Sequence, residues 1–137
     1  MALHKLVFPQ EVEVHYIIPG MRREFAIAMK GMNIEQKKIA KYLVVSEAAV
    51  SQYLSDKRAT EVQFSDAVKA LIASAAERLI KTNNFMEEGS KILNYIKQEK
   101  TTCKICVNFT HEKDKSCKMC FNLPELIGNK INLIQLK

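Results

Sequence analysis

Apolar residues recur at helical spacing along most of the chain, with only short polar intervals between the periodic stretches. Residues 61–81 show the clearest pattern, because their apolar positions follow the i, i+3, i+4, i+7 rule over about five turns. Shorter periodic stretches lie between residues 21 and 55 and again between residues 85 and 100. We therefore expect an all-α fold, a bundle of four to six helices.

Residues 1–19 form an ambiguous N-terminal segment. Two valines alternate there with glutamates as in a strand, whereas Pro9 suits the first turn of a helix, which is the interpretation that we favour. Pro19 and Gly20 are expected to interrupt the chain before a short helix that ends at Gly31.

Two short helices are expected between residues 33 and 55, joined so tightly that they must cross steeply. Asn33 can cap the first helix, with Gln36 three residues later as the partner of a capping box, and this helix runs to Leu43. Ser46 caps the second helix in the same way, which leaves two valines as the whole connection.

This helix pair has the pattern of a helix-turn-helix that starts at Gln36. Ala40 is the most informative residue, because only a small side chain fits where two helices cross so closely. The other positions expected to be buried are Ile39, Leu43, Val45, Val50 and either Tyr53 or Leu54.

The opposite face of the second helix carries short or hydrogen-bonding side chains, which suits insertion into the major groove of DNA. Gln52, for example, can pair bidentately with adenine. The residues expected to face the bases are Ser46, Glu47, Ala48, Ser51, Gln52 and Ser55. The flanking cations expected to reach phosphates are Lys37, Lys38, Lys41, Lys57 and Arg58.

The segment IEQKKIAKYLVVSEAAVSQYLSDKRA resembles the helix-turn-helix of the Cro and phage-repressor (Xre-type) family. The residues that carry the resemblance are Gln36, Ala40, Val45, Ser46, Val50 and Ser51. The resemblance covers residues 20–81 as a DNA-binding domain. It implies a bundle of four or five helices, residues 46–55 as the recognition helix, Gln36 on a phosphate, and a dimer on a pseudo-palindromic operator.

Val44 departs from the family pattern, because members often have glycine at this turn position with a positive φ. That conformation costs a β-branched residue about 1–2 kcal/mol, so either the turn differs or packing carries the strain. The opening residues, taken with the cysteines near the C-terminus, also resemble a group of archaeal Xre-type regulators.

Four cysteines form two C-x2-C pairs, Cys103 with Cys106 and Cys117 with Cys120. Four thiolates at this spacing can hold one metal centre, either zinc or an iron–sulfur cluster (4Fe-4S or 2Fe-2S). The glycines that follow the second cysteine of each pair in zinc knuckles are absent, while the apolar neighbours suit both alternatives. We expect residues 101–137 to form a cysteine-rich metal-binding tail.

The net charge of +6 is concentrated toward the ends of the chain, and the first 60 residues carry 9 basic against 6 acidic side chains. Such a balance suits a polyanionic partner. No stretch reaches the roughly 18 consecutive apolar residues that span a bilayer, and the N-terminus lacks the apolar core of a signal peptide. We expect a cytoplasmic protein without a membrane partner.

These patterns predict a sequence-specific transcriptional regulator that binds double-stranded DNA and responds to metal or redox state through the cysteines. An enzyme is not expected, because the chain has no Gly-rich phosphate loop, no HExxH and no nucleophile with an evident base. We expect a homodimer formed mainly through residues 61–100, of which 82–100 form a packing or dimerising helix, because the apolar stripes exceed what a small monomer needs. The alternatives are a thiol redox protein or electron carrier, and a zinc-containing RNA-binding or adaptor module.

Overall fold

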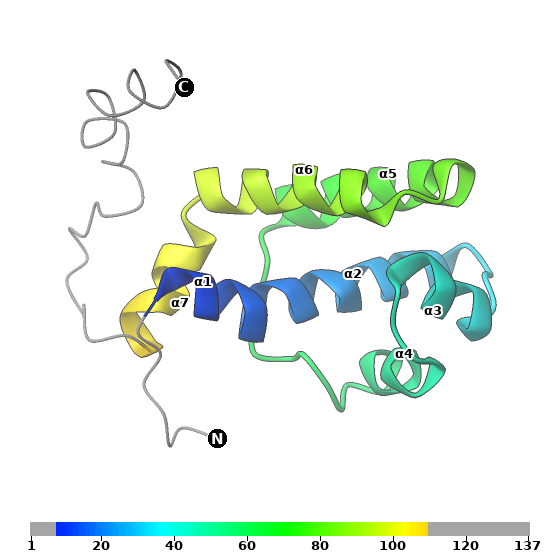
Figure 1. Ribbon diagram of the computed structural model, residues 1–137, viewed down its shortest axis with the longest axis horizontal. Coiled ribbons are helices and arrows are strands. Elements are labelled where there is room, and N and C mark those ends of the chain that lie inside the picture. Colours follow the sequence, from blue (N-terminus) through cyan, green and yellow to red (C-terminus); the bar gives the residue numbers. More distant parts are fainter. Residues whose placement is uncertain (1–7, 110–137) are drawn as a thin grey trace, which may run out of the picture.

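The computed structural model describes residues 8–109, with side chains described as far as residue 105, and every regular element in this range is helical (Figure 1). The elements in chain order are α1 (Pro9–Val12), the π-helical turn η1 (Glu13–Ile17), α2 (Ile18–Gly31), α3 (Gln36–Leu43), α4 (Glu47–Leu54), α5 (Asp66–Thr82), α6 (Phe85–Gln98) and α7 (Thr101–Phe109). Because α1, η1 and α2 continue as one rod, this range holds six helices. The expectation of an all-α fold is confirmed for the described residues, and the tail from residue 110 lies outside them.

From Pro9 onward the N-terminal segment is helical, with Pro9 in the first turn, and it joins α2 without the interruption that we expected at Pro19 and Gly20. A proline ring normally clashes with the preceding turn of an α-helix. Here the π-helical turn before Pro19 widens the helix, since the N–H of Ile18 reaches a carbonyl one residue further back than in an α-helix. Gly20 allows close packing instead, because a Cβ at this position would lie 3.2 Å from the ring of Phe64.

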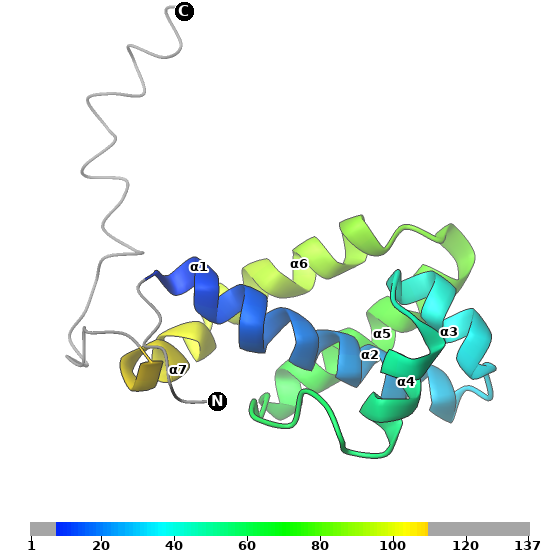
Figure 2. The same cartoon turned by 60° about the horizontal axis from the view of Figure 1, so that its bottom comes forward.

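Helix α2 runs through the middle of the bundle and contacts α3, α4 and α5, while α5 pairs with α6 (Figure 2). Its Phe25 is fully buried and meets Phe85 of α6 edge-on, with the ring centroids 5.3 Å apart. The other large buried side chains are Val12, Ile17, Met21, Met29, Ile39, Leu43, Val50, Val68, Ile72, Leu79 and Ile96. A single apolar core therefore extends from α1 to α6.

Helix α5 begins later than the expected start at residue 61. Ser65 caps it by accepting a hydrogen bond from the N–H of Val68 at 3.2 Å, and Val62 and Phe64 enter the core from the preceding non-helical segment. The apolar stripe of α5 packs against α2 and α6 of the same chain. Most of this stripe is therefore buried within one chain, and a homodimer formed through residues 61–100 stays a prediction.

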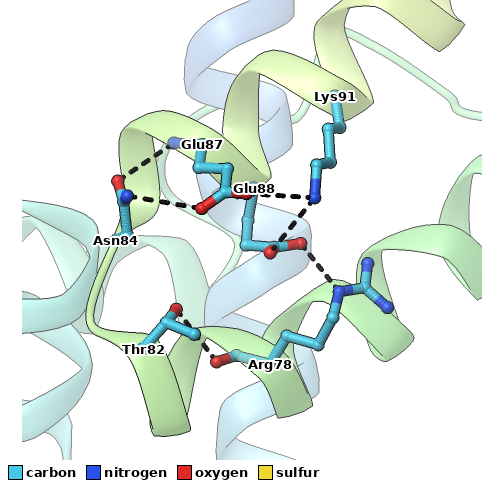
Figure 3. Close-up of polar contacts among 6 residues, drawn as sticks. All are labelled: Arg78, Thr82, Asn84, Glu87, Glu88 and Lys91. Atoms are coloured by element: carbon cyan, nitrogen blue, oxygen red, sulfur yellow. Dashed lines mark hydrogen bonds and ion pairs between the residues drawn. The ribbon is translucent and has the colours of Figure 1, made fainter.

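The corner between α5 and α6 is held by polar contacts around one buried carboxylate (Figure 3). Glu88 is 2% exposed, and its carboxylate accepts a hydrogen bond from Nε of Arg78 at 3.0 Å and lies 3.8 Å from Nζ of Lys91. Asn84 caps α6 by accepting a hydrogen bond from the N–H of Glu87 at 3.2 Å. The corner separates the two stretches of helical periodicity that the sequence shows, residues 61–81 and 85–100.

Helix α7 extends the bundle into residues 101–109, which we expected to belong to the cysteine-rich tail. It packs against α1 and α6, and Thr101 and Thr102 in its first turn are buried. Both views place α7 at the end of the α1–α2 rod that lies away from α3 and α4 (Figures 1 and 2).

Candidate nucleic-acid interface

Helices α3 and α4 form a compact pair on the C-terminal half of α2 (Figure 2). Ala40 is 5% exposed, as the steep crossing requires, and Ile39, Leu43 and Val50 are completely buried. Of the two candidates at the end of the pair, Tyr53 is the buried residue, whereas Leu54 and Val45 are half-buried. Ala49, 3% exposed, was missed, although it lies one helical turn before Tyr53 and so on the same face.

Asn33 does not cap α3, contrary to expectation. The helix begins at Gln36 after Glu35, whose side chain makes no capping bond. Asn33 instead closes α2 in the left-handed conformation with φ 61°, and the N–H of Ile34 donates to the carbonyl of Met29 at 3.2 Å. This is the Schellman closure of a helix, for which asparagine is well suited.

The cap of α4 is as predicted, because Oγ of Ser46 accepts a hydrogen bond from the N–H of Ala49 at 3.1 Å. One acidic residue, Glu47, lies in the first turn, where the helix dipole favours negative charge. The two features define the N-terminus of α4 locally, so the helix can be short and still start at a fixed residue.

The turn between the two helices keeps the positive φ that the family pattern implies, even though Val44 occupies it. Val44 has φ 57° and ψ 50°, and the N–H of Val45 donates to the carbonyl of Ala40 at 3.0 Å. The side chain of Val44 is largely in solvent, since the residue is 74% exposed. Burial of Val44 therefore does little to offset the backbone strain of about 1–2 kcal/mol. Packing of the other residues in the helix pair offsets it instead.

Two adjacent arginines of α2 hold the C-terminal ends of both helices. Nε of Arg22 donates a hydrogen bond to the carbonyl of Leu43, the last residue of α3, at 3.2 Å. Arg23 forms an ion pair with Asp56, which follows α4, and its other terminal nitrogen lies 3.5 Å from the carboxylate of Glu24. The sequence analysis did not identify either arginine. Two adjacent positive charges in the middle of a helix were the signal that could have indicated their role.

The residues proposed to read bases form one solvent-facing surface of α4. Ser46, Glu47, Ala48, Ser51 and Ser55 are exposed, and Gln52 is half-buried. Among these only one side chain carries a charge, and Oγ of Ser55 donates to the carbonyl of Ser51 at 2.9 Å, which keeps the hydroxyl close to the helix. Because most of these side chains are short, another macromolecule can approach the backbone of α4 closely.

Exposed basic side chains lie on α3 and in the segment that follows α4. Lys37, Lys38 and Lys41 are exposed on α3, and Lys57 and Arg58 are exposed after α4. Within residues 8–109, none of these five cations forms an ion pair with a carboxylate. Gln36 is half-buried in the first turn of α3.

The four cysteines divide between described and undescribed residues. Positions 103 and 106 lie three residues apart on α7 and thus on the same face of that helix, and Cys103 is half-buried. Cys117 and Cys120 lie outside the described residues. No group of three or more histidine, cysteine or acidic side chains capable of holding a metal occurs in the part of the chain that the structure describes.

No family model, no curated protein and no solved structure matches the chain. Over the described helices, none combines the length and apolar character needed to cross a membrane. Functional inference therefore depends on the geometry of the residues above.

Proposed function

We propose that this protein is a sequence-specific regulator of transcription that binds double-stranded DNA through α3 and α4. The observation that supports the proposal most strongly is the exposed face of α4. This face is compact, starts at a fixed N-cap and is accompanied by exposed cations that form no ion pair within residues 8–109. A helix enters the major groove only when its leading side chains are small, and flanking lysines and arginines then reach the phosphates.

Each residue of the interface has a proposed role. Gln52 forms bidentate hydrogen bonds to adenine, Glu47 accepts from the amino group of cytosine, and Ala48 contacts a thymine methyl group. Gln36 and the N–H groups of the first turn of α3, which receive no side-chain cap, bind a phosphate. The remaining phosphate contacts are assigned to Lys37, Lys41, Lys57 and Arg58.

Selection of binding sites from random duplexes, followed by gel shifts with the selected duplex and the matching RNA, tests the proposal. Gln52→Ala is expected to change the preferred base at one position of each half-site. Lys41→Ala is expected to weaken binding to all sequences and to lower the slope of log K against log salt by about 0.9. Equal, sequence-blind losses from both variants would count against the assigned reading face. Binding of RNA in preference to duplex DNA would favour the RNA-binding alternative.

A homodimer is part of the proposal, because a single short recognition helix contacts few base pairs and paired half-sites supply the missing specificity. The large apolar side chains left exposed on α5 and α6 are Leu71, Met86 and Tyr95. Sedimentation of the free protein and of its complex with a two-half-site duplex tests this point, and a monomer in both states would refute it.

We also propose that the four cysteines hold one metal centre, zinc or an iron–sulfur cluster. The placement of positions 103 and 106 on one helix face fits two thiolate ligands of a shared metal, with Cys117 and Cys120 as the other two. Anaerobic purification followed by metal and sulfide analysis and a visible spectrum distinguishes the two metals. Electron transfer to an acceptor without any DNA binding would favour the redox-protein alternative.

A further inference from the structure

A groove of about 630 Å³ opens between α2, the end of α3 and the first turns of α6, directly beside the helix-turn-helix. Its more buried lining includes Met21, Phe85 and Leu93, and its exposed lining includes Val44 and Met86. Met86 is 82% exposed. The volume falls within the range of about 300–1,000 Å³ that is typical of small-molecule sites.

Two cations line the groove, and none of its described lining residues is acidic. Arg22 donates through Nε to the carbonyl of Leu43 and lies with its guanidinium carbon 5.6 Å from the centroid of the Phe85 ring. Its two terminal nitrogens find no acceptor among residues 8–109. Lys41, on the neighbouring turn of α3, is exposed and has no ion pair in the same range.

The two other arginines within the described helices, Arg23 on α2 and Arg78 on α5, differ in this respect. Arg23 pairs with Asp56, and Arg78 pairs with the buried carboxylate of Glu88 (Figure 3). The Arg22 guanidinium is thus held by one hydrogen bond from Nε. Its two terminal nitrogens can donate to a ligand beside the apolar surface of the groove. Such a site selects an anion that has an apolar body.

We propose that this groove binds a small organic carboxylate with an apolar or aromatic body, and that the bound molecule regulates the helix-turn-helix. A carboxylate can accept two parallel hydrogen bonds from a guanidinium. The apolar body would cover the Phe85 ring and the side chain of Met86, whose flexible thioether adapts to ligands of different shape. The ion pairs that the buried Glu88 carboxylate forms with the partly exposed Arg78 and Lys91 help to fix the position of α6, which forms this wall of the groove.

The regulatory part of the inference rests on the proposed DNA-binding function. Lys41 belongs both to the groove and to the proposed phosphate contacts, so a ligand carboxylate beside it competes with DNA for the same positive charge. Arg22 holds the last carbonyl of α3, and Val44 of the strained turn forms part of the groove lining. A bound carboxylate is therefore expected to weaken DNA binding.

Calorimetric titration of the full chain with naphthoate tests the site without any reference to DNA. We expect a Kd of about 1 mM or lower, from the contribution per atom that is usual for small ligands. The uncharged naphthalenemethanol is expected to bind about tenfold to a hundredfold more weakly, because it lacks the charge-assisted hydrogen bonds. Equal affinities for acid and alcohol, or no binding of naphthoate, would overturn the proposal.

Two variants of α6 locate the site. Ser90 is exposed and lines the groove, so Ser90→Trp fills it, whereas Asn94 is exposed on the same helix outside the groove, so Asn94→Trp is the matched control. We expect S90W to abolish naphthoate binding and N94W to retain it, and unchanged binding by S90W would overturn the assignment. Nuclear Overhauser contacts between naphthoate and the methyl group of Met86 in the unaltered protein give a readout that no variant can disturb, and their absence would also overturn it.

Gel shifts with the selected duplex then test regulation. Naphthoate is expected to weaken DNA binding by the unaltered protein and by N94W, and to leave binding by S90W unchanged. If DNA binding occurs but naphthoate does not alter it, the regulatory inference is refuted. If the titrations succeed and no DNA binds, the groove stands as a carboxylate site and the proposed function fails. If naphthoate does not bind and S90W turns a dimer into a monomer in sedimentation, a second copy occupies the groove and the proposal is refuted.

Discussion

Replacing Val44 by asparagine is expected to stabilise the protein, because the change relieves backbone strain at the turn between α3 and α4. The left-handed conformation at φ 57° costs a β-branched residue about 1–2 kcal/mol, whereas asparagine adopts it readily. The chain already uses asparagine in this way after α2 and α5, at Asn33 with φ 61° and Asn83 with φ 53°.

The loss that opposes this gain is small. Val44 is 74% exposed, so only about a quarter of its surface is buried, and full burial of a valine is worth about 1.5–3 kcal/mol. The lost burial therefore costs about 0.5 kcal/mol, and the net gain in the free energy of unfolding is about 0.5–1.5 kcal/mol. For a chain of 137 residues, 1 kcal/mol corresponds to a rise in Tm of roughly 3–5 °C.

Urea denaturation followed by circular dichroism measures the change, with the slope m compared to ensure that the unfolded state is unaltered. Val45→Asn is the matched control, since Val45 is the half-buried neighbour without a positive φ, and this change is expected to destabilise. If Val44→Asn leaves stability unchanged or lowers it at constant m, the turn is not strained and the reasoning is refuted.

Four further substitutions test other parts of the structure by the same denaturation assay. Ser46→Ala removes the cap of α4 and is expected to cost about 1 kcal/mol; no loss would mean that the cap does not define the start of this helix. Gly31→Ala is expected to raise the free energy of unfolding by about 0.5–1 kcal/mol, because nothing lies within 4 Å of the new Cβ. Gly20→Ala is expected to give no such gain, because its Cβ would press against the ring of Phe64. Equal effects of the two substitutions would contradict this close approach. Arg22→Met removes the hydrogen bond to the end of α3 and should cost about 1–2 kcal/mol, and a neutral result would show that this bond does not support the helix pair.

Sequence alone predicted the features that depend on residues close to one another in the chain. The spacing of apolar residues located α3 and α4 and identified Ile39, Ala40 and Val50 as buried. The Ser46 cap followed from a side chain three residues from its donor. These contacts are formed within one or two helical turns, so their residue types specify them before any tertiary packing occurs.

Local rules were wrong where distant segments decided between competing local structures. Pro19 and Gly20 usually break a helix, but a π-helical turn accommodates the proline and the glycine makes room for Phe64. Asn33 can either cap a helix or close one, and the packing of α3 on α2 leaves it two residues too early to cap α3.

Tertiary structure alone decided how the α3–α4 pair is held and what lies beside it. Arg22 is 21 residues from Leu43, and Arg23 is 33 residues from Asp56, so no local pattern could pair them. The groove likewise combines side chains of α2, α3 and α6. The sequence determines a helix through bonds between neighbours, whereas the placement of one helix against another depends on which of many apolar faces pack together in the whole chain.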